Sequence, residues 1–230
     1  MQETQSSYSS IISATSLFGG VQIFKIIIAV IRSKAIAILL GPIGMGIEGL
    51  LTSSTALISS STNLGLGISA VRDVAEANNS KNDNRIAIVV AVVRKLVWIT
   101  GTLGAVITFT LASYLSNIAF GNEEYEVAFR WLSFTLLCNQ LTSGQNVLLQ
   151  GLRKLAYLAK ANLLGSFVGL LVSLPIYYFF KIDGIVPAMI ISSVLHLIFA
   201  WFFSDKVKIN RVKINTSELI IEGNEIIKMG

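Results

Sequence analysis

Six long apolar runs, separated by short polar stretches, dominate the pattern of this chain. A helix needs about 20 apolar residues to cross the roughly 30 Å hydrocarbon core of a bilayer. The runs of that length are Ile11–Ile31, Ile47–Val71, Ile86–Leu115, Ala128–Leu149, Ala159–Phe180 and Ile185–Phe203. The pattern therefore predicts an all-α fold, a polytopic membrane helix bundle of about six transmembrane helices.

The stretches between the runs carry turn and helix-breaking residues. They are Gly41–Gly44, Asn78–Asn84, Phe120–Asn122 and Lys181–Gly184. They are short, so we expect no inserted soluble domain. Residues 1–203 are predicted to form a transmembrane lobe, and residues 204–230 a polar, mixed-charge linker or tail.

Composition supports the membrane interpretation. Hydrophobic residues make up 53% of the chain and charged residues 13%, against about 25% charged residues in soluble domains. The mean hydropathy is +0.69. The single cysteine, Cys138, excludes an intramolecular disulfide and any multi-cysteine metal site. We expect no cofactor and no bound metal.

Lysine and arginine lie mostly on one side of the predicted bundle. Thirteen of them fall on the side that holds both termini, while Arg32, Lys34, Arg130 and Lys181 fall on the other, beside the acidic stretch Asn122–Glu126. By the positive-inside rule, both termini are predicted to be cytoplasmic. The net charge of +5 thus reflects membrane topology, and we expect no nucleic-acid partner.

Several charged residues lie within or beside the first two runs. A cation inside the hydrocarbon costs at least about 2.5 kcal/mol, so Lys25 is predicted to face a bundle interior or a wet cavity. Arg32 lies two helical turns further on and shares its face if the helix continues that far. Lys34 follows closely, and Glu48 opens the second run. Arg32 and Lys34 have a second interpretation, as snorkelling anchors at the membrane surface.

The second run is rich in hydroxyl groups, and four-residue spacing places Thr55, Ser59, Asn63 and Gly67 on one face. Such a helix is either buried among its neighbours or lines an aqueous cavity.

In the sixth run, His196, the only histidine, is a candidate for proton coupling or a neutral, buried core residue.

The fifth run carries small residues at four-residue spacing: Ala161, Gly165, Gly169 and Ser173. Small residues let helix backbones approach closely where no hydrophobic force drives helices together. We therefore predict that this stripe packs against a neighbouring helix and does not contact substrate.

Four segments in order resemble the N-terminal half of Wzx-type flippases, the polysaccharide-transporter branch of the multidrug/oligosaccharidyl-lipid/polysaccharide exporter superfamily. They are KAIAILLGPIGMGIEG at 34–49, LGLGISAVRDVAE at 64–76, AFGNEEY at 119–125 and LLQGLRKLAYLAKANLLGS at 148–166. The resemblance implies one lobe of a two-lobed, alternating-access exporter in the bacterial inner membrane. It implies a lipid-linked oligosaccharide as substrate, of the O-antigen or enterobacterial-common-antigen type. The implied partners are membrane lipids, a second lobe or second copy, and polysaccharide polymerase machinery.

The resemblance also bears on single residues. In related lipid II flippases a basic residue before the glycine of the first loop, and an acid after it, face the cavity. Arg32 and Glu48 occupy similar places around Gly41. With Lys25, Lys34 and Asn63 they form our set of candidate substrate-binding residues.

Three other functional classes stay open from the sequence. A drug/cation antiporter of the same superfamily would prefer acidic cavity residues, whereas bases outnumber acids here. A truncated, non-functional remnant would fold without transporting. A membrane-embedded enzyme fits least, because the sequence offers no catalytic constellation, and we expect the chain not to be an enzyme.

Overall fold

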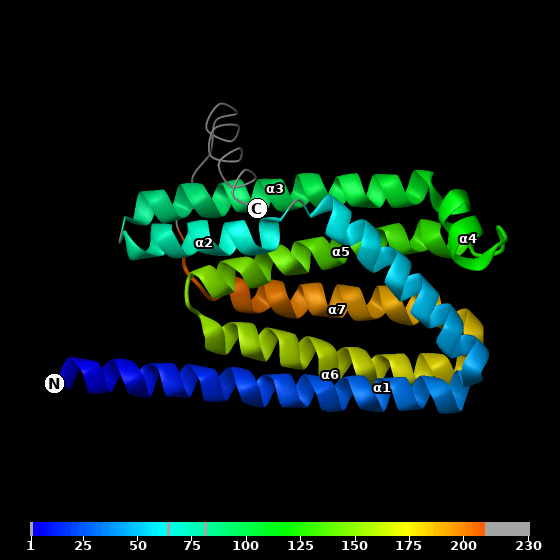
Figure 1. Ribbon diagram of the computed structural model, residues 1–230, viewed down its shortest axis with the longest axis horizontal. Helices are drawn as coiled ribbons and strands as arrows, with labels where there is room; N and C mark the ends of the chain where they lie inside the picture. Colours follow the sequence, from blue (N-terminus) through cyan, green and yellow to red (C-terminus); the bar gives the residue numbers. More distant parts are fainter. Residues whose placement is uncertain (1, 64, 81, 210–230) are drawn as a thin grey trace.

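A computed structural model describes residues 2–63, 65–80 and 82–209, with the backbone alone for residues 2–19. This part of the chain is all helical, as predicted. Its elements are α1 (Gln2–Thr62), α2 (Leu66–Asn79), α3 (Asp83–Thr110), α4 (Ala112–Phe120), α5 (Glu126–Gly151), α6 (Leu155–Phe180), the 3-10 helix η1 (Lys181–Gly184) and α7 (Ile185–Asp205). Figure 1 shows the first part of α1 and the helices α2, α3, α5, α6 and α7 running along one direction, as in a membrane helix bundle, while the second part of α1 crosses them obliquely.

Helix α1 is bent sharply at Gly41, where φ is 68° and ψ is −170°. Only glycine adopts this backbone conformation readily, and Pro42 follows directly as the first residue of the next helical segment. The bend divides α1 into a first limb, residues 2–40, and a second limb, residues 42–62. The second limb turns back across the bundle (Figure 1). The predicted break at Gly41–Gly44 is thus confirmed.

Two predicted spans are not single helices. The run Ile47–Val71 is interrupted between Thr62 and Leu66, where Gly65 has a φ of 72°. The run Ile86–Leu115 is divided at Leu111, between α3 and α4. The prediction of one uninterrupted helix was wrong in both places. An apolar run indicates that a segment lies within the membrane, but it does not reveal where the backbone changes direction.

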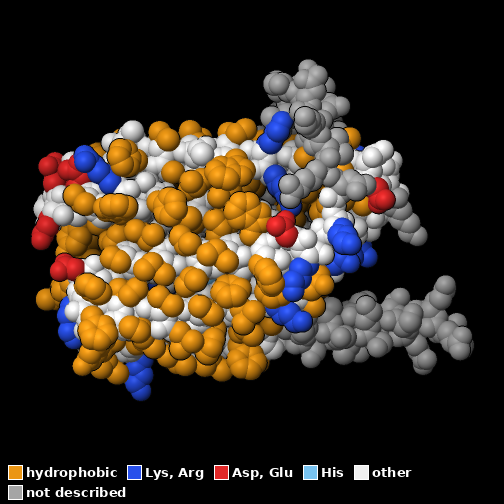
Figure 2. All heavy atoms as spheres, turned by 180° about the vertical axis from the view of Figure 1, so that it is seen from behind, with side chains coloured by type: hydrophobic (Ala, Val, Ile, Leu, Met, Phe, Trp, Pro, Cys, Tyr) orange, Lys and Arg blue, Asp and Glu red, His pale blue; other side chains and the backbone are white. Residues whose placement is uncertain are grey.

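Connections at the two ends of the bundle differ in charge. One end, here called the acidic end, holds the bend at Gly41, α4, η1 and the loop Gly121–Tyr125 with Glu123 and Glu124. The other, the basic end, holds the α2–α3 and α5–α6 connections and the end of α7. Figure 2 shows a group of acidic side chains at one end, beside some basic ones, charged side chains of both signs at the other end, and a broad apolar belt between the ends.

Hydrogen bonds and ring stacking order the loop at the acidic end. The Ser116 hydroxyl donates to the Asn122 carbonyl at 2.7 Å and accepts from the Tyr125 backbone N–H at 3.1 Å. The rings of Phe120 and Tyr125 stack with centroids 4.0 Å apart. Burial and the nearby Glu124 carboxylate raise the pKa of the Tyr125 hydroxyl, so it stays neutral at physiological pH.

The apolar belt contains many exposed large side chains, among them Phe24, Ile99, Phe109 and Phe179. Such surface is stable only when a lipid or a protein covers it. Two helical stretches of the described chain are long and apolar enough to cross a membrane, judged by length and composition: Asp83–Thr110 and Leu155–Asp205, which joins α6, η1 and α7. The fold is accordingly that of a helical membrane bundle.

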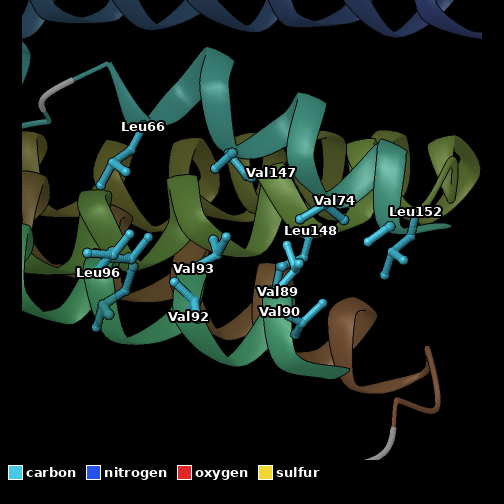
Figure 3. Packing of buried hydrophobic residues seen from close by; sticks show 14 residues of the cluster. Leu66, Val74, Val89, Val90, Val92, Val93, Leu96, Val147, Leu148 and Leu152 are labelled. Atoms are coloured by element: carbon cyan, nitrogen blue, oxygen red, sulfur yellow. The ribbon is translucent and has the colours of Figure 1, made fainter. Parts of the chain in front are cut away.

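Buried side chains hold the bundle together in separate clusters. At the basic end, α2, α3 and α5 meet around Val74, Val89, Val93 and Leu148 (Figure 3). At the acidic end, a second cluster around Leu51, Phe129 and Tyr177 joins the second limb of α1 to α5 and α6.

The small-residue stripe of α6 packs against α7, as predicted. All four of its residues are buried. A Cβ added at Gly165 would lie 2.8 Å from Cδ2 of His196, and one at Gly169 would lie 3.6 Å from Ser192. The glycines therefore allow the two helices to come close together.

Candidate functional site

The bend at Gly41 brings two predicted residues of α1 together. Because the second limb folds back toward the first, Arg32 and Glu48 form an ion pair, with 3.1 Å between Nη2 and Oε1. The same nitrogen donates to the hydroxyl of Tyr177 on α6 at 3.3 Å. Tyr177 is fully buried, whereas the side chains of Arg32 and Glu48 are 33% and 22% exposed. We call these three residues the arginine site.

The guanidinium of Arg32 does not use all of its N–H donors within the arginine site. Both of its hydrogen bonds in the arginine site come from Nη2. Its Nε is buried and has no hydrogen-bond partner within the described residues. A guanidinium presents five N–H donors in a planar fork that suits two oxygens of one anion. Because Nε is buried, an anion can reach Arg32 only at the terminal nitrogens of the guanidinium, beside Glu48 or in its place.

Two more predicted residues, Lys25 and His196, lie on α1 and α7, two helices that each pack against α6. His196 on α7 contacts the hydroxyl of Ser166 on α6, with 3.2 Å between Nε2 and Oγ. Lys25 is partly buried, and α1 continues through Arg32, so these two cations share one face of the helix as predicted.

Asn63 belongs to a separate polar cluster at the interruption between α1 and α2. The Gln140 side-chain amide of α5 donates to Oδ1 of Asn63 at 2.8 Å and to the Thr100 hydroxyl of α3 at 3.1 Å. In a membrane protein, a break in a helix is tolerated where other groups satisfy the freed backbone or the break lines a cavity. This cluster ties the break to α3 and α5.

Many hydroxyls of the second limb bond to their own helix. Thr55 donates to the Leu51 carbonyl, Ser61 to that of Leu57 and Thr62 to that of Ile58, all at 2.9 Å. Thr55 and Thr62 are buried, whereas Ser60 and Ser61 are exposed. The second limb thus has one packed face and one exposed face, and an aqueous cavity along it stays a prediction. Gly67 lies beyond the break, in α2, so it does not continue the predicted face of this limb.

The structure brings together some of the predicted site residues and separates others. Arg32 and Glu48 are in contact, and Lys25 lies on the same face of α1 as Arg32. His196 contacts Ser166, Asn63 lies in the Gln140 cluster, and the Lys34 side chain is exposed. Sequence reasoning missed Tyr177. A tyrosine within an apolar run was the available signal, because its hydroxyl needs a partner when buried.

No group of three or more His, Cys, Asp and Glu side chains that could hold a metal ion occurs in the described part of the chain.

Comparison with known families supplies one finding. The family model described as polysaccharide biosynthesis protein matches residues 11–223, which is nearly the whole chain. Neither the curated proteins nor the solved structures gave a match.

Proposed function

Because the chain belongs to the polysaccharide biosynthesis protein family, we propose that it carries an undecaprenyl-pyrophosphate-linked oligosaccharide across the bacterial inner membrane. The lipid tail of such a substrate can stay in the bilayer, whereas its pyrophosphate and sugars need a polar, cationic path. The substrate is of the O-antigen or enterobacterial-common-antigen type. The chain acts as one lobe of an alternating-access flippase, multi-pass and with both termini in the cytoplasm.

The spare donor capacity of Arg32 is the observation that carries this proposal. A cation at membrane depth is costly, and such residues generally mark a substrate or ion path. Glu48 balances the charge of Arg32 while no substrate is bound. A pyrophosphate offers several oxygens to the same guanidinium and displaces the carboxylate. Lys25 lies on the same helical face and meets the second phosphate group as a point charge.

Substrate binding would then be coupled to the shape of α1. Arg32 lies on the first limb and Glu48 on the second, so their ion pair links the two limbs across the bend at Gly41. Replacement of Glu48 by pyrophosphate releases this link. The limbs remain joined by the buried cluster that contains Ile36, Leu40 and Leu51, so the release is local to the arginine site. It would accompany the rocking of this lobe against a second one that alternating access requires.

The proposal is tested by export of the glycan from cells that lack the native gene. Lys25→Ala should abolish export while protein level and membrane insertion stay normal, and Lys25→Arg should retain part, because charge is the property required. Lys160→Ala, which removes an exposed lysine of α6 outside the site, is the matched control and should export normally. Full export by the Lys25→Ala protein would show that Lys25 is a surface anchor with no part in transport.

A further inference from the structure

A second basic site lies at the other end of the bundle from the arginine site. It is a pocket of about 490 Å³ between the α2–α3 connection, the start of α6 and the end of α7. Three lysines line it, Lys154, Lys206 and Lys208, against a single carboxylate, Asp83. The side chains of Asn78 and Tyr157 add an amide and a phenol hydroxyl. We call it the basic pocket.

Local backbone geometry places Lys154 at the rim. Helix α5 ends in a tight turn in which Arg153 has a φ of 56°. There the Arg153 N–H donates to the Gln150 carbonyl at 3.0 Å and the Lys154 N–H to the Leu149 carbonyl at 2.8 Å. Helix α6 starts at Leu155, so this turn fixes the position of Lys154 relative to both helices.

Aromatic rings hold the second lysine. The ammonium of Lys206 lies 4.4 Å from the ring centre of Phe202 and 5.2 Å from that of Phe203. The Phe203 ring in turn lies 6.1 Å from that of Tyr157, a lining residue. A cation held over aromatic rings loses less conformational entropy when it binds an anion than a free surface lysine does.

The walls of the pocket are apolar. Ile86, Leu152, Val207 and Ile209 line it beside the lysines. A pocket with cationic groups and apolar walls, at the end of a membrane helix bundle, matches a phosphate group attached to a lipid. Basic pockets between transmembrane helices recognise anionic lipid headgroups in this way.

We propose that the basic pocket binds a phosphate-bearing polar group, and that this group is the headgroup of an anionic membrane phospholipid. Lys154, Lys206 and Lys208 contact the phosphate oxygens, Asn78 and Tyr157 bond the rest of the headgroup, and the apolar walls cover the glycerol and upper acyl carbons. The pocket is separate from the arginine site and does not depend on the proposed transport function.

The test measures lipid binding by the purified protein in an uncharged detergent. Fluorescent phosphatidylglycerol is titrated in, with fluorescent phosphatidylcholine as the zwitterionic reference. The variant Lys154→Gln/Lys208→Gln should bind phosphatidylglycerol more weakly, by about fivefold per lysine. The matched control Arg72→Gln/Lys160→Gln removes two exposed charges near the same end but outside the pocket, and should keep its affinity. Helix content by circular dichroism confirms folding of each variant.

A third arm separates the two sources of phosphate. If millimolar glycerol phosphate displaces the lipid, the pocket binds phosphate but its ligand is a soluble molecule. If glycerol phosphate leaves the binding of phosphatidylglycerol unchanged, the ligand is a lipid. If both double variants lost the same affinity for phosphatidylglycerol, general surface charge would explain the binding and the proposal would be overturned. Equal affinity of the unmodified protein for the two lipids would overturn it as well.

Discussion

At the scale of single residues, Arg32 and Glu48 show how a charged pair can serve both folding and binding. Each charge would be costly alone in a membrane bundle, and their contact with Tyr177 offsets that cost. The pair is nevertheless partly exposed, and Arg32 keeps unused donors. The partial exposure is what would let an anion reach the terminal nitrogens of Arg32, and the variants below separate a structural role from a binding role.

This difference leads to a prediction with double variants. Glu48→Leu alone leaves Arg32 without its counterion and should lower unfolding stability by about 1–3 kcal/mol, less than for a fully buried pair because water reaches both groups. Arg32→Leu/Glu48→Leu removes both charges and should recover most of that loss, as measured by thermal unfolding in detergent.

Export of the glycan by the same variants decides the role of the pair. The double variant should be stable and yet fail to export. If it exported at the normal rate, the pair would be structural only, and Arg32 would leave the list of substrate-binding residues.

At the scale of elements, the bend at Gly41 determines which side chains can meet. A straight helix would place Glu48 about 24 Å beyond Arg32 along its axis, at 1.5 Å per residue. The observed bend brings them to 3.1 Å. The interruption between α1 and α2 has a similar effect, because it presents Asn63 to Gln140 on α5.

The role of the bend at Gly41 can be tested with a matched pair of substitutions at Gly41 and Gly46. No heavy atom lies within 4 Å of a Cβ added at either glycine, so steric contact with neighbours is excluded as a cause. Gly41→Ala should cost about 1–3 kcal/mol, since an alanine is strained at a φ of 68° and a ψ of −170°.

Gly46 lies in regular helix, so Gly46→Ala should be neutral or stabilising by up to about 1 kcal/mol. Thermal unfolding of the two variants in detergent is the measurement. Equal stability of the two would show that the bend is not a fixed feature of α1 and that the contact between Arg32 and Glu48 does not depend on it.

At the scale of the whole molecule, the long apolar runs were sufficient to predict the helical bundle, and the turn residues most of its connections. The small residues of α6 predicted close packing against a neighbouring helix, which the structure identifies as α7. For Arg32 and Glu48, the resemblance to lipid II flippases led us to expect that both face the same cavity, but not that they form an ion pair. Tyr177 and Thr100 could not be assigned, because their partners are 145 and 40 residues away in the sequence. Contacts of that range depend on the directions of α1, α3, α5 and α6, which hydrophobicity does not specify.

Charge distribution leads to a topology prediction. The loop at the acidic end is expected outside and the α2–α3 connection inside. After replacement of the single, buried Cys138 by alanine, Asn122→Cys should react with a membrane-impermeant thiol reagent in intact cells. Asn79→Cys should react only after the cells are opened, since both asparagines are exposed on the protein and differ only in compartment. The reverse pattern would invert the orientation.

The exposed polar face of α1 leads to the last prediction, that a partner covers it. Arg32 on the first limb and Glu48 on the second are partly exposed, and Thr52, Ser53, Ser60 and Ser61 are exposed on the second limb. Hydroxyls that bond to their own helix are inexpensive in lipid, but an exposed arginine is not. We therefore expect a second lobe or a second copy of the chain to cover this face. When the 230-residue chain is expressed without such a partner, it should not restore surface polysaccharide.

A photocrosslinking amino acid at position 53 should form an adduct with a protein, either a second helical lobe or another copy of the chain. The same group at position 109, an exposed phenylalanine of α3, should react with lipid alone. Restored polysaccharide from the isolated chain, together with lipid adducts alone at position 53, would mean that a single lobe transports by itself and that the polar face of α1 is in contact with lipid.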